Sequence, residues 1–341
     1  MRGTKALRMP AFGEPPFVHR LLEWYRQAGR DLPWRQAPTA YQVVVSELML
    51  QQTTVATALI RYPRFLQAFP DFWSLAAASE DEVVAEWAGL GYYQRARHLS
   101  RIARRVVADG MPHTESAWRQ MPGVGPYTAA AIIAFAEGGR ALAIDVNVRR
   151  TLSRLFALRD TPQIDAAIRA AMEPFLPPDS GELNQALIEL GALICRPARP
   201  HCDSCPVAQA CAGRDQLALY GRPPAKPAVR DELVHLVAVR RAGRLLVRQR
   251  TTRLLQGLWG LPQAQEHGHG LPDRVQAGDV TPTPVHFTHR FTHRRWQVQC
   301  TVVDGDGEGR WIDPRAPDVA LAGPDRRAIQ MLVEGGFFDA R

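Results

Sequence analysis

The sequence predicts two folded domains of different class, a mainly α domain over residues 17–220 and an α+β domain over residues 232–341. The length of 341 residues exceeds the usual size of one domain. Apolar residues recur every three or four positions in the first part, whereas short alternating runs dominate the second. The stretch GRPPAKPAVRD, residues 221–231, is rich in proline and charge and is typical of a linker. We expect residues 1–16 to form a flexible polar tail.

The composition, with 46% hydrophobic and 22% charged residues, is that of a globular protein with two cores. The net charge of +8 favours polyanionic partners. No run approaches the roughly 18 apolar residues of a membrane span, and the N-terminus lacks the apolar segment of a signal peptide. We therefore expect a cytoplasmic protein without a membrane partner.

The helical pattern is clearest in PTAYQVVVSELMLQQT, residues 38–53. Thr39 and Gln42 have the spacing of a capping box, which predicts a helix start at this point. One buried stripe is predicted on this helix at Tyr41, Val44, Val45 and Leu48.

A sharp corner is predicted at PGVGPY, residues 122–127. Glycines permit a positive φ and leave room for a phosphate to approach backbone N–H groups. Pro126 suits the first turn of a following helix, where its missing N–H costs nothing. The hexapeptide alone is compatible with a helix–hairpin–helix that binds phosphate or with an ordinary helix connection.

Four of the five cysteines lie close together with the spacing C-x6-C-x2-C-x5-C, which suggests a metal or cluster site rather than disulfides. A structural zinc is the alternative, but the spacing lacks the usual paired CxxC, so a 4Fe–4S cluster is favoured. The four are Cys195, Cys202, Cys205 and Cys211. Cys300 stands apart in a strand-like run and is interpreted as structural.

Two carboxylates have both a structural and a functional interpretation. Asp145 precedes the helical pattern VNVRRTLSRL and is a favoured N-cap residue. Glu47 lies among apolar residues and faces either solvent or a pocket, where desolvation would raise its pKa for general-acid work.

The α+β domain is predicted from its strand patterns. ELVHLVAVRRAGRLLVRQR indicates two strands around a turn at Gly243, and RWQVQCTVV indicates another strand. GPDRRAIQMLVEGGFF predicts a closing helix.

Together, the PGVGPYTAAAI corner, the aspartate of IDVNVRR and the cysteine spacing resemble the endonuclease III superfamily of DNA glycosylases over residues 17–220. The resemblance implies a helix–hairpin–helix domain that binds duplex DNA as a monomer in the bacterial nucleoid. It implies that the four cysteines hold a 4Fe–4S cluster, that Asp145 stabilises an oxocarbenium ion and that Asn147 orients the sugar or this carboxylate. The hairpin residues that it implies in DNA binding are Gly123, Val124, Gly125 and Thr128.

Two further stretches resemble the MutY family of adenine glycosylases within this superfamily. They are LPWRQAPTAYQVVVSELMLQQT and GLGYYQRARHL. The first implies that Glu47 protonates adenine in a site lined by Arg35, Gln52 and Tyr127. The second implies that Tyr92 inserts into the duplex beside the base opposite the adenine.

Tyr127 distinguishes two reactions. Bifunctional members of the superfamily carry at this position a lysine that forms a Schiff base and cuts the strand. Here the residue is tyrosine, and no lysine lies between residues 6 and 225. The sequence therefore predicts a monofunctional enzyme that leaves an abasic site intact.

The second domain resembles the Nudix-like C-terminal domain of the MutY family, through LLQGLWGLPQ and FTHRRWQVQ. The resemblance implies that Phe291, Thr292 and His293 read 8-oxoguanine opposite the adenine. A near copy, Phe287, Thr288 and His289, leaves a second register open. Nudix hydrolysis itself is not expected, because the domain lacks the clustered glutamates that would hold a metal ion.

The predicted function is removal of adenine paired with 8-oxoguanine or guanine, by base flipping and acid-assisted hydrolysis of the N-glycosidic bond. Two alternatives remain. One is an endonuclease III-type glycosylase and lyase for oxidised pyrimidines, and the other is a non-catalytic iron–sulfur DNA-binding protein.

Overall fold

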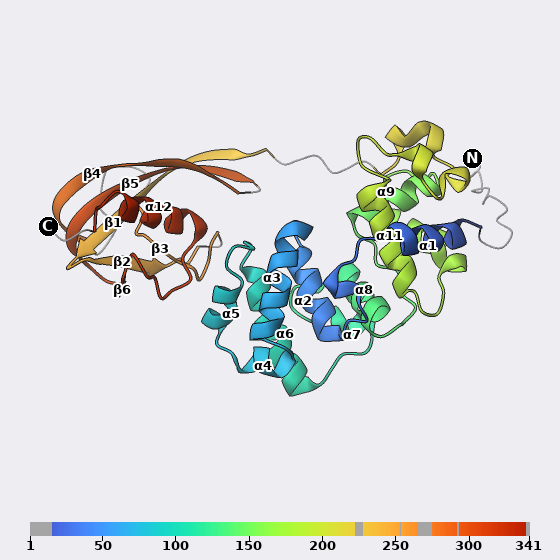
Figure 1. The fold of residues 1–341 in the computed structure, drawn as a ribbon, viewed down its shortest axis with the longest axis horizontal. Coiled ribbons are helices and arrows are strands. Elements are labelled where there is room, and N and C mark those ends of the chain that lie inside the picture. The colour runs from blue at the N-terminus through green and yellow to red at the C-terminus, as the bar shows by residue number, and fades with distance from the viewer. Residues whose placement is uncertain (1–15, 222–227, 253, 265–274, 292, 339–341) are drawn as a thin grey trace, which may run out of the picture. The chain divides into compact units, whose positions relative to one another are not determined.

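The computed structural model describes residues 16–221, 228–252, 254–264, 275–291 and 293–338 (Figure 1). The predicted tail up to residue 15 and most of the linker lie outside these residues. The chain forms two compact units, one within Met1–Trp73 and Arg101–Pro224 and one within Ser74–Ser100 and Ala225–Arg341. Residues 74–100 fall in the second unit, and the domain boundaries given above therefore stay a prediction.

The first part of the chain is helical, as its periodicity predicts. Its principal helices are α1 (Pro16–Ala28), α2 (Ala40–Leu50), α3 (Val55–Ala68), α4 (Phe72–Ala77), α5 (Glu80–Glu86), α6 (Gln94–Asp109), α7 (Glu115–Trp118), α8 (Pro126–Ala136), α9 (Val146–Leu155), α10 (Ile164–Met172) and α11 (Gly181–Leu193). Short 3-10 turns follow, among them η3 (Cys202–Ser204) and η4 (Ala208–Ala210).

Helix α11 is a central element of the first unit, because it packs against α1, α8 and α9. Helix α2 packs against α3 and α8. Its start confirms the predicted capping box, since the Thr39 hydroxyl accepts from the Gln42 N–H and the Gln42 side chain accepts from the Thr39 N–H. The predicted stripe on α2 is confirmed as buried at Tyr41, Val44, Val45 and Leu48. Helix α2 is thereby fixed in its rotation about its own axis.

The corner between α7 and α8 has the predicted geometry. Gly123 adopts a φ of 78°, in the left-handed region that glycine tolerates without strain. Gly125 is the N-cap of α8, and Pro126 occupies its first turn. The buried indole of Trp118 anchors α7 on the other side of the corner.

The second unit contains a mixed sheet with the strand order β3-β2-β1-β5-β4, in which β6 also pairs with β2. Strands β1 (Arg230–Arg241) and β5 (Arg294–Gly307) are parallel, and the other pairs are antiparallel. The remaining strands are β2 (Arg244–Gln249), β3 (Trp259–Gly260), β4 (Val275–Arg290) and β6 (Arg310–Ile312).

The predicted hairpin and closing helix of this unit are both present. Ala242 and Gly243, between β1 and β2, have φ values of 48° and 72°, as a two-residue type I′ turn requires. Helix α12 (Gly323–Glu334) places Ala328, Ile329 and Leu332 in the same core as the inward side chains of the sheet. None of the helices in the described ranges has the length and hydrophobicity needed to cross a membrane.

Candidate active site and cysteine-lined cavity

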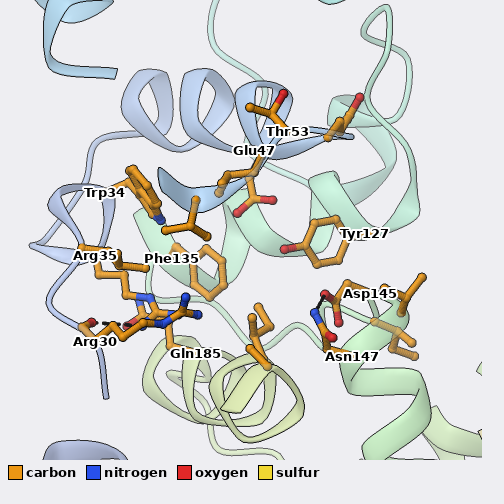
Figure 2. A pocket seen from close by; sticks show the side chains of 18 of the residues that line it. Arg30, Trp34, Arg35, Glu47, Thr53, Tyr127, Phe135, Asp145, Asn147 and Gln185 are labelled. Atoms are coloured by element: carbon orange, nitrogen blue, oxygen red, sulfur yellow. Dashed lines mark hydrogen bonds between the residues drawn. The ribbon is translucent and has the colours of Figure 1, made fainter. Parts of the chain in front are cut away.

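A cavity of about 550 Å³ opens in the first unit and gathers side chains from distant parts of the sequence (Figure 2). Helix α2 contributes Glu47, the first turn of α8 contributes Tyr127, and the start of α9 contributes Asp145 and Asn147. Arg35 comes from the short turn η1 (Pro33–Arg35). Five predicted site residues therefore line one space.

Glu47 is buried, with 7% of its surface exposed, and it lines the cavity rather than facing solvent. The pKa of Glu47 is raised to about 7, mainly by burial and in smaller part by the negative charge of Asp145. A hydrogen bond with Tyr127 and the charge of Arg35 act in the opposite direction. The carboxyl group can therefore carry a proton near neutral pH and donate it into the cavity.

Tyr127 and Glu47 point toward each other across the cavity (Figure 2). Burial raises the pKa of Tyr127 well above its usual value, and the charges of Glu47 and Asp145 raise it further. The hydroxyl is therefore a neutral hydrogen-bonding group at physiological pH and not a nucleophilic phenolate.

Asp145 is both a helix N-cap and a cavity-lining residue. It is the N-cap of α9, where its Oδ1 accepts from the Val148 N–H at 2.6 Å, and it lines the cavity. Its Oδ2 accepts from Asn147 Nδ2 at 2.8 Å. Burial raises the pKa of Asp145, and these hydrogen bonds oppose the rise by favouring the anion.

Arg150 connects Asn147, the hydrogen-bond partner of Asp145, to the cysteine-bearing loop. Its Nη2 donates to Asn147 Oδ1 at 3.0 Å and to the Gly191 carbonyl at 2.8 Å. Its Nε donates to the Cys195 carbonyl at 2.8 Å. A Cβ on Gly191 would lie 2.6 Å from the Cβ of Asn147, so only glycine lets α11 approach α9 this closely.

Arg35 is held by a buried carboxylate that the sequence analysis missed. Glu189 on α11 has no exposed side-chain surface and accepts from Arg35 Nη2 at 2.6 Å and from Arg30 Nε at 2.5 Å. Burial alone would raise the pKa of Glu189, but the hydrogen bonds from the two arginines outweigh it and lower the pKa. A glutamate within the apolar helix NQALIELGAL was the available signal.

Two predicted site residues, Gln52 and Thr128, lie in surroundings that differ from those expected. Gln52 is exposed, has a φ of 59° and does not line the cavity, whereas its neighbours Gln51 and Thr53 do. Thr128 is only 2% exposed, so its hydroxyl is not presented at the surface of the hairpin.

The other hairpin residues differ in exposure. Gly123 is exposed, Gly125 is partly exposed and the Val124 side chain is buried. The backbone of the two glycines is therefore the accessible part of the corner. Tyr92, the predicted wedge, lies in the turn before α6 and is 46% exposed.

The four clustered cysteines line one small cavity beside the end of α11. All are free and partly exposed. Arg154 Nη1 lies 3.5 Å from Cys195 Sγ, so a cation faces this sulfur. Within the described residues no three His, Cys, Asp or Glu side chains are arranged around a single ion. The donor set fits a thiolate-bound group in its composition, its common cavity and its adjacent arginine.

The two candidate FTH registers of the second unit have different surroundings. Phe287 is 9% exposed, with the Arg327 guanidinium 4.6 Å from its ring centroid. The Thr288 hydroxyl donates to Gln297 on the adjacent strand. Phe291 follows β4 and is partly exposed, whereas His293 is exposed, and Thr292 lies outside the described residues.

Two family models match the chain. Residues 45–177 match the model of HhH-GPD superfamily base excision DNA repair proteins, and residues 234–331 match the model of NUDIX domains. The matches confirm the predicted fold class, a helix–hairpin–helix domain followed by a Nudix-like α+β domain.

The chain is similar to proteins named adenine DNA glycosylase. The one from Homo sapiens is 42% identical over 220 residues, which cover 59% of this chain and 40% of the human protein. The one from Buchnera aphidicola subsp. Schizaphis graminum is 34% identical over 203 residues, which cover 57% of this chain and 58% of that protein. The chain thus spans about half the length of these relatives.

Two solved structures have a similar fold. A thermostable thymine-DNA glycosylase superposes with a TM-score of 0.55 at 28% identity and covers 59% of this chain and 95% of its own. Endonuclease III in a non-covalent DNA complex superposes with a TM-score of 0.50 at 20% identity and covers 58% of this chain and 94% of its own. The second likeness concerns the fold alone.

Replacement of Glu47 by glutamine should stabilise the folded protein above pH 7. The folded-state pKa of Glu47, about 7, exceeds the ordinary value of 4.5. The folded state therefore keeps a proton that the unfolded state loses, and wild-type stability falls as the pH rises from 4.5 to about 7. At pH 8, the free energy of unfolding of Glu47→Gln should exceed that of the wild type by about 3 kcal/mol.

Urea unfolding at pH 4.5 and pH 8 measures this difference. Glu23 on α1 is exposed, and Glu23→Gln is the matched control that should leave both values unchanged. An equal effect of the two substitutions at pH 8 would show that desolvation of Glu47 does not operate.

Proposed function

We propose that the chain is a monofunctional adenine DNA glycosylase of the HhH-GPD superfamily, whose family model matches residues 45–177. The observation that carries the proposal is the buried Glu47 opposite Asp145 in one cavity. The similarity to adenine DNA glycosylases supports adenine as the base removed. The substrate is duplex DNA with adenine opposite 8-oxoguanine or guanine, which the net charge of +8 favours as a partner.

In the proposed reaction the adenine nucleotide is flipped into the cavity, and Glu47 protonates the base. Protonation makes adenine a neutral leaving group when the N-glycosidic bond breaks. A pKa of about 7 suits this step, because a large fraction of the acid is protonated near neutral pH and its anion is only moderately basic afterwards. Tyr127 orients the Glu47 carboxyl group through their hydrogen bond.

Asp145 stabilises the positive charge that develops on the deoxyribose. Its carboxylate is held by the Val148 N–H and by Asn147, so it is oriented before the substrate arrives. Water then adds to the sugar and leaves an abasic site. The division between a proton donor and an anionic carboxylate follows the logic of two-carboxylate glycosidases.

The strand remains uncut in this proposal. Strand cleavage by a Schiff base requires an amine near the sugar, whereas position 127 is tyrosine and residues 6–225 contain no lysine. The raised pKa of Tyr127 also disfavours a phenolate nucleophile.

The second unit is assigned to reading the oxidised base opposite the adenine, through Phe291, Thr292 and His293. The first FTH copy is less suited, because Phe287 contributes to the core and Thr288 is bonded to Gln297. The second copy follows the paired part of β4, and its histidine is exposed.

Cys195, Cys202, Cys205 and Cys211 are proposed to hold a 4Fe–4S cluster. Such a cluster takes one thiolate for each iron, and the donor set here is four thiols around one cavity. When bound, the cluster supplies a rigid cross-link of the loop after α11. Arg154 faces the Cys195 sulfur and so offsets part of the negative charge of the thiolates.

Base loss and strand cleavage on three duplexes test the proposed activity. We expect adenine release from A:8-oxoguanine, no release from A:T, no action on thymine glycol, and no covalent trapping with borohydride. The excision rate should fall as the pH rises above 7, because Glu47 then loses its proton. Glu47→Gln should lower the rate by about a hundredfold or more while DNA binding persists.

The other outcomes identify the alternatives. Cleavage of thymine glycol duplexes with borohydride trapping would favour the glycosylase and lyase. Binding of DNA without loss of any base would favour the non-catalytic protein. Glu23→Gln is the control for Glu47→Gln in the rate measurement.

Replacement of Phe291 or His293 by alanine should lower discrimination between 8-oxoguanine and guanine. Loss of one base contact should reduce the ratio of the two excision rates by about tenfold. Thr288→Ala is the matched control in the first FTH copy and should leave the ratio unchanged. The reverse pattern would assign lesion reading to the first copy.

Iron and acid-labile sulfide analysis tests the cluster. The purified protein should contain both in equal amounts, and Cys202→Ser should lose them because one ligand is removed. Cys300→Ser is the control, since Cys300 is buried in the second unit. Zinc in place of iron would contradict the proposal.

A further inference from the structure

The turn that carries Tyr92 has an unusual backbone. Gly89 and Gly91 have φ values of 90° and 67°, and Tyr92 itself has a φ of 48°. An aromatic residue rarely adopts this left-handed region, because its Cβ crowds the backbone. Such a conformation persists where the surrounding structure holds it in place. The turn therefore needs an element that fixes it.

Arg95, in the first turn of α6, is that element. Its Nη2 donates to the Leu90 and Gly91 carbonyls, each at 2.9 Å. Its Nε donates to the Tyr92 carbonyl at 3.4 Å, and its backbone N–H donates to the same carbonyl at 2.9 Å. One side chain thus binds three successive carbonyls of the turn.

The same guanidinium also contacts two aromatic rings. The Arg95 Cζ lies 5.3 Å from the Trp87 ring centroid and 5.6 Å from the Tyr92 ring centroid. Trp87 is fully buried, and its Nε1 donates to the Gly91 carbonyl at 3.1 Å. Cation–π contacts are strongest where the cation is desolvated, and Arg95 is 5% exposed.

Arg95 remains charged despite its burial. Desolvation lowers its pKa to about 10, and the neighbouring Tyr92 opposes the decrease. At neutral pH a buried cation therefore supports the Tyr92 ring, which itself is 46% exposed. The strained residue projects into solvent, while its support lies in the interior.

We propose that Arg95 is the positioning residue that holds Tyr92 ready for insertion into the DNA base stack. The proposal rests on the DNA glycosylase function proposed above, in which Tyr92 enters the duplex. Insertion by a mobile side chain would lose conformational entropy, whereas a pre-organised one avoids that loss. The planar fork of arginine is needed because it donates to several carbonyls while it stacks on a ring.

Excision from two substrates distinguishes positioning from general stabilisation. In one duplex adenine lies opposite 8-oxoguanine, and in the other it lies opposite an abasic-site analogue, where no partner base has to be unstacked. Arg95→Met should slow single-turnover excision about tenfold on the first duplex, the effect expected for a desolvated cation–π contact. On the second duplex the rate should change by about twofold or less, because insertion is not required there.

A double-mutant cycle gives the second readout. If Arg95 acts through Tyr92, removing Arg95 should have little effect once Tyr92 is gone. The excision rate of the double variant Tyr92→Ala, Arg95→Met should therefore be within about twofold of the rate of Tyr92→Ala alone. The proposal would be overturned if the fold-decrease in the double variant equalled the product of the two single fold-decreases. It would also be overturned if Arg95→Met slowed excision equally on both duplexes. Arg95→Lys keeps the charge without the fork and serves in the same comparison if the methionine variant does not fold.

Arg241→Met is a matched control, because the Arg241 guanidinium on strand β1 also contacts an aromatic ring, 4.4 Å from the Trp311 ring centroid, but is not part of the Tyr92 turn. It should leave the ratio of the two rates unchanged.

2-Aminopurine opposite the target adenine reports unstacking independently of excision. Wild-type protein should raise its fluorescence, and Arg95→Met should raise it less.

The fluorescence separates the two proposals. Arg95-dependent unstacking without adenine release would overturn the glycosylase function and leave the positioning role intact. Adenine release with equal unstacking by wild type and Arg95→Met would overturn the positioning role alone.

Discussion

Desolvation of the Glu47 carboxyl group is the constraint on which the rest of the cavity depends. Helix α2 is buried along most of its length, so Glu47 cannot turn toward water without exposing the apolar stripe beside it. An ionised carboxylate in this position lacks its hydration shell, and its pKa rises for that reason. The packing of α2 therefore sets the protonation state of the group that faces the cavity.

The pKa of the second carboxylate, Asp145, depends on the hydrogen bonds that it accepts. Asp145 is also largely buried, but the Val148 N–H and Asn147 donate to its two oxygens, and the start of α9 adds a favourable dipole. Both groups feel desolvation, yet the hydrogen bonds favour the anion at Asp145 more than at Glu47. One cavity can thus hold a proton donor and a charge stabiliser without a difference in residue chemistry beyond one methylene group.

Local signals predicted local geometry well. The capping box at Thr39 and the hairpin at Gly243 depend on residues adjacent in sequence, so the pattern alone specifies them. The role of Gln52 stays a prediction: Gln51 and Thr53 line the cavity and Gln52 between them does not, and QQT does not reveal the positive φ at this residue. Glu189 was missed because its partners, Arg30 and Arg35, lie 159 and 154 residues away.

The arginine-rich composition has structural consequences beyond charge. Arg35, Arg95 and Arg150 are all largely buried, and Arg95 and Arg150 donate to backbone carbonyls in the Tyr92 turn and at Cys195. Lysine offers a strongly hydrated point charge and could not bind several carbonyls in one plane. Arginine therefore makes the contacts that hold these loops, and the described lining of the cavity contains no lysine amine that could attack the sugar. The use of arginine rather than lysine in this chain thus bears both on how the loops are held and on whether a Schiff base can form.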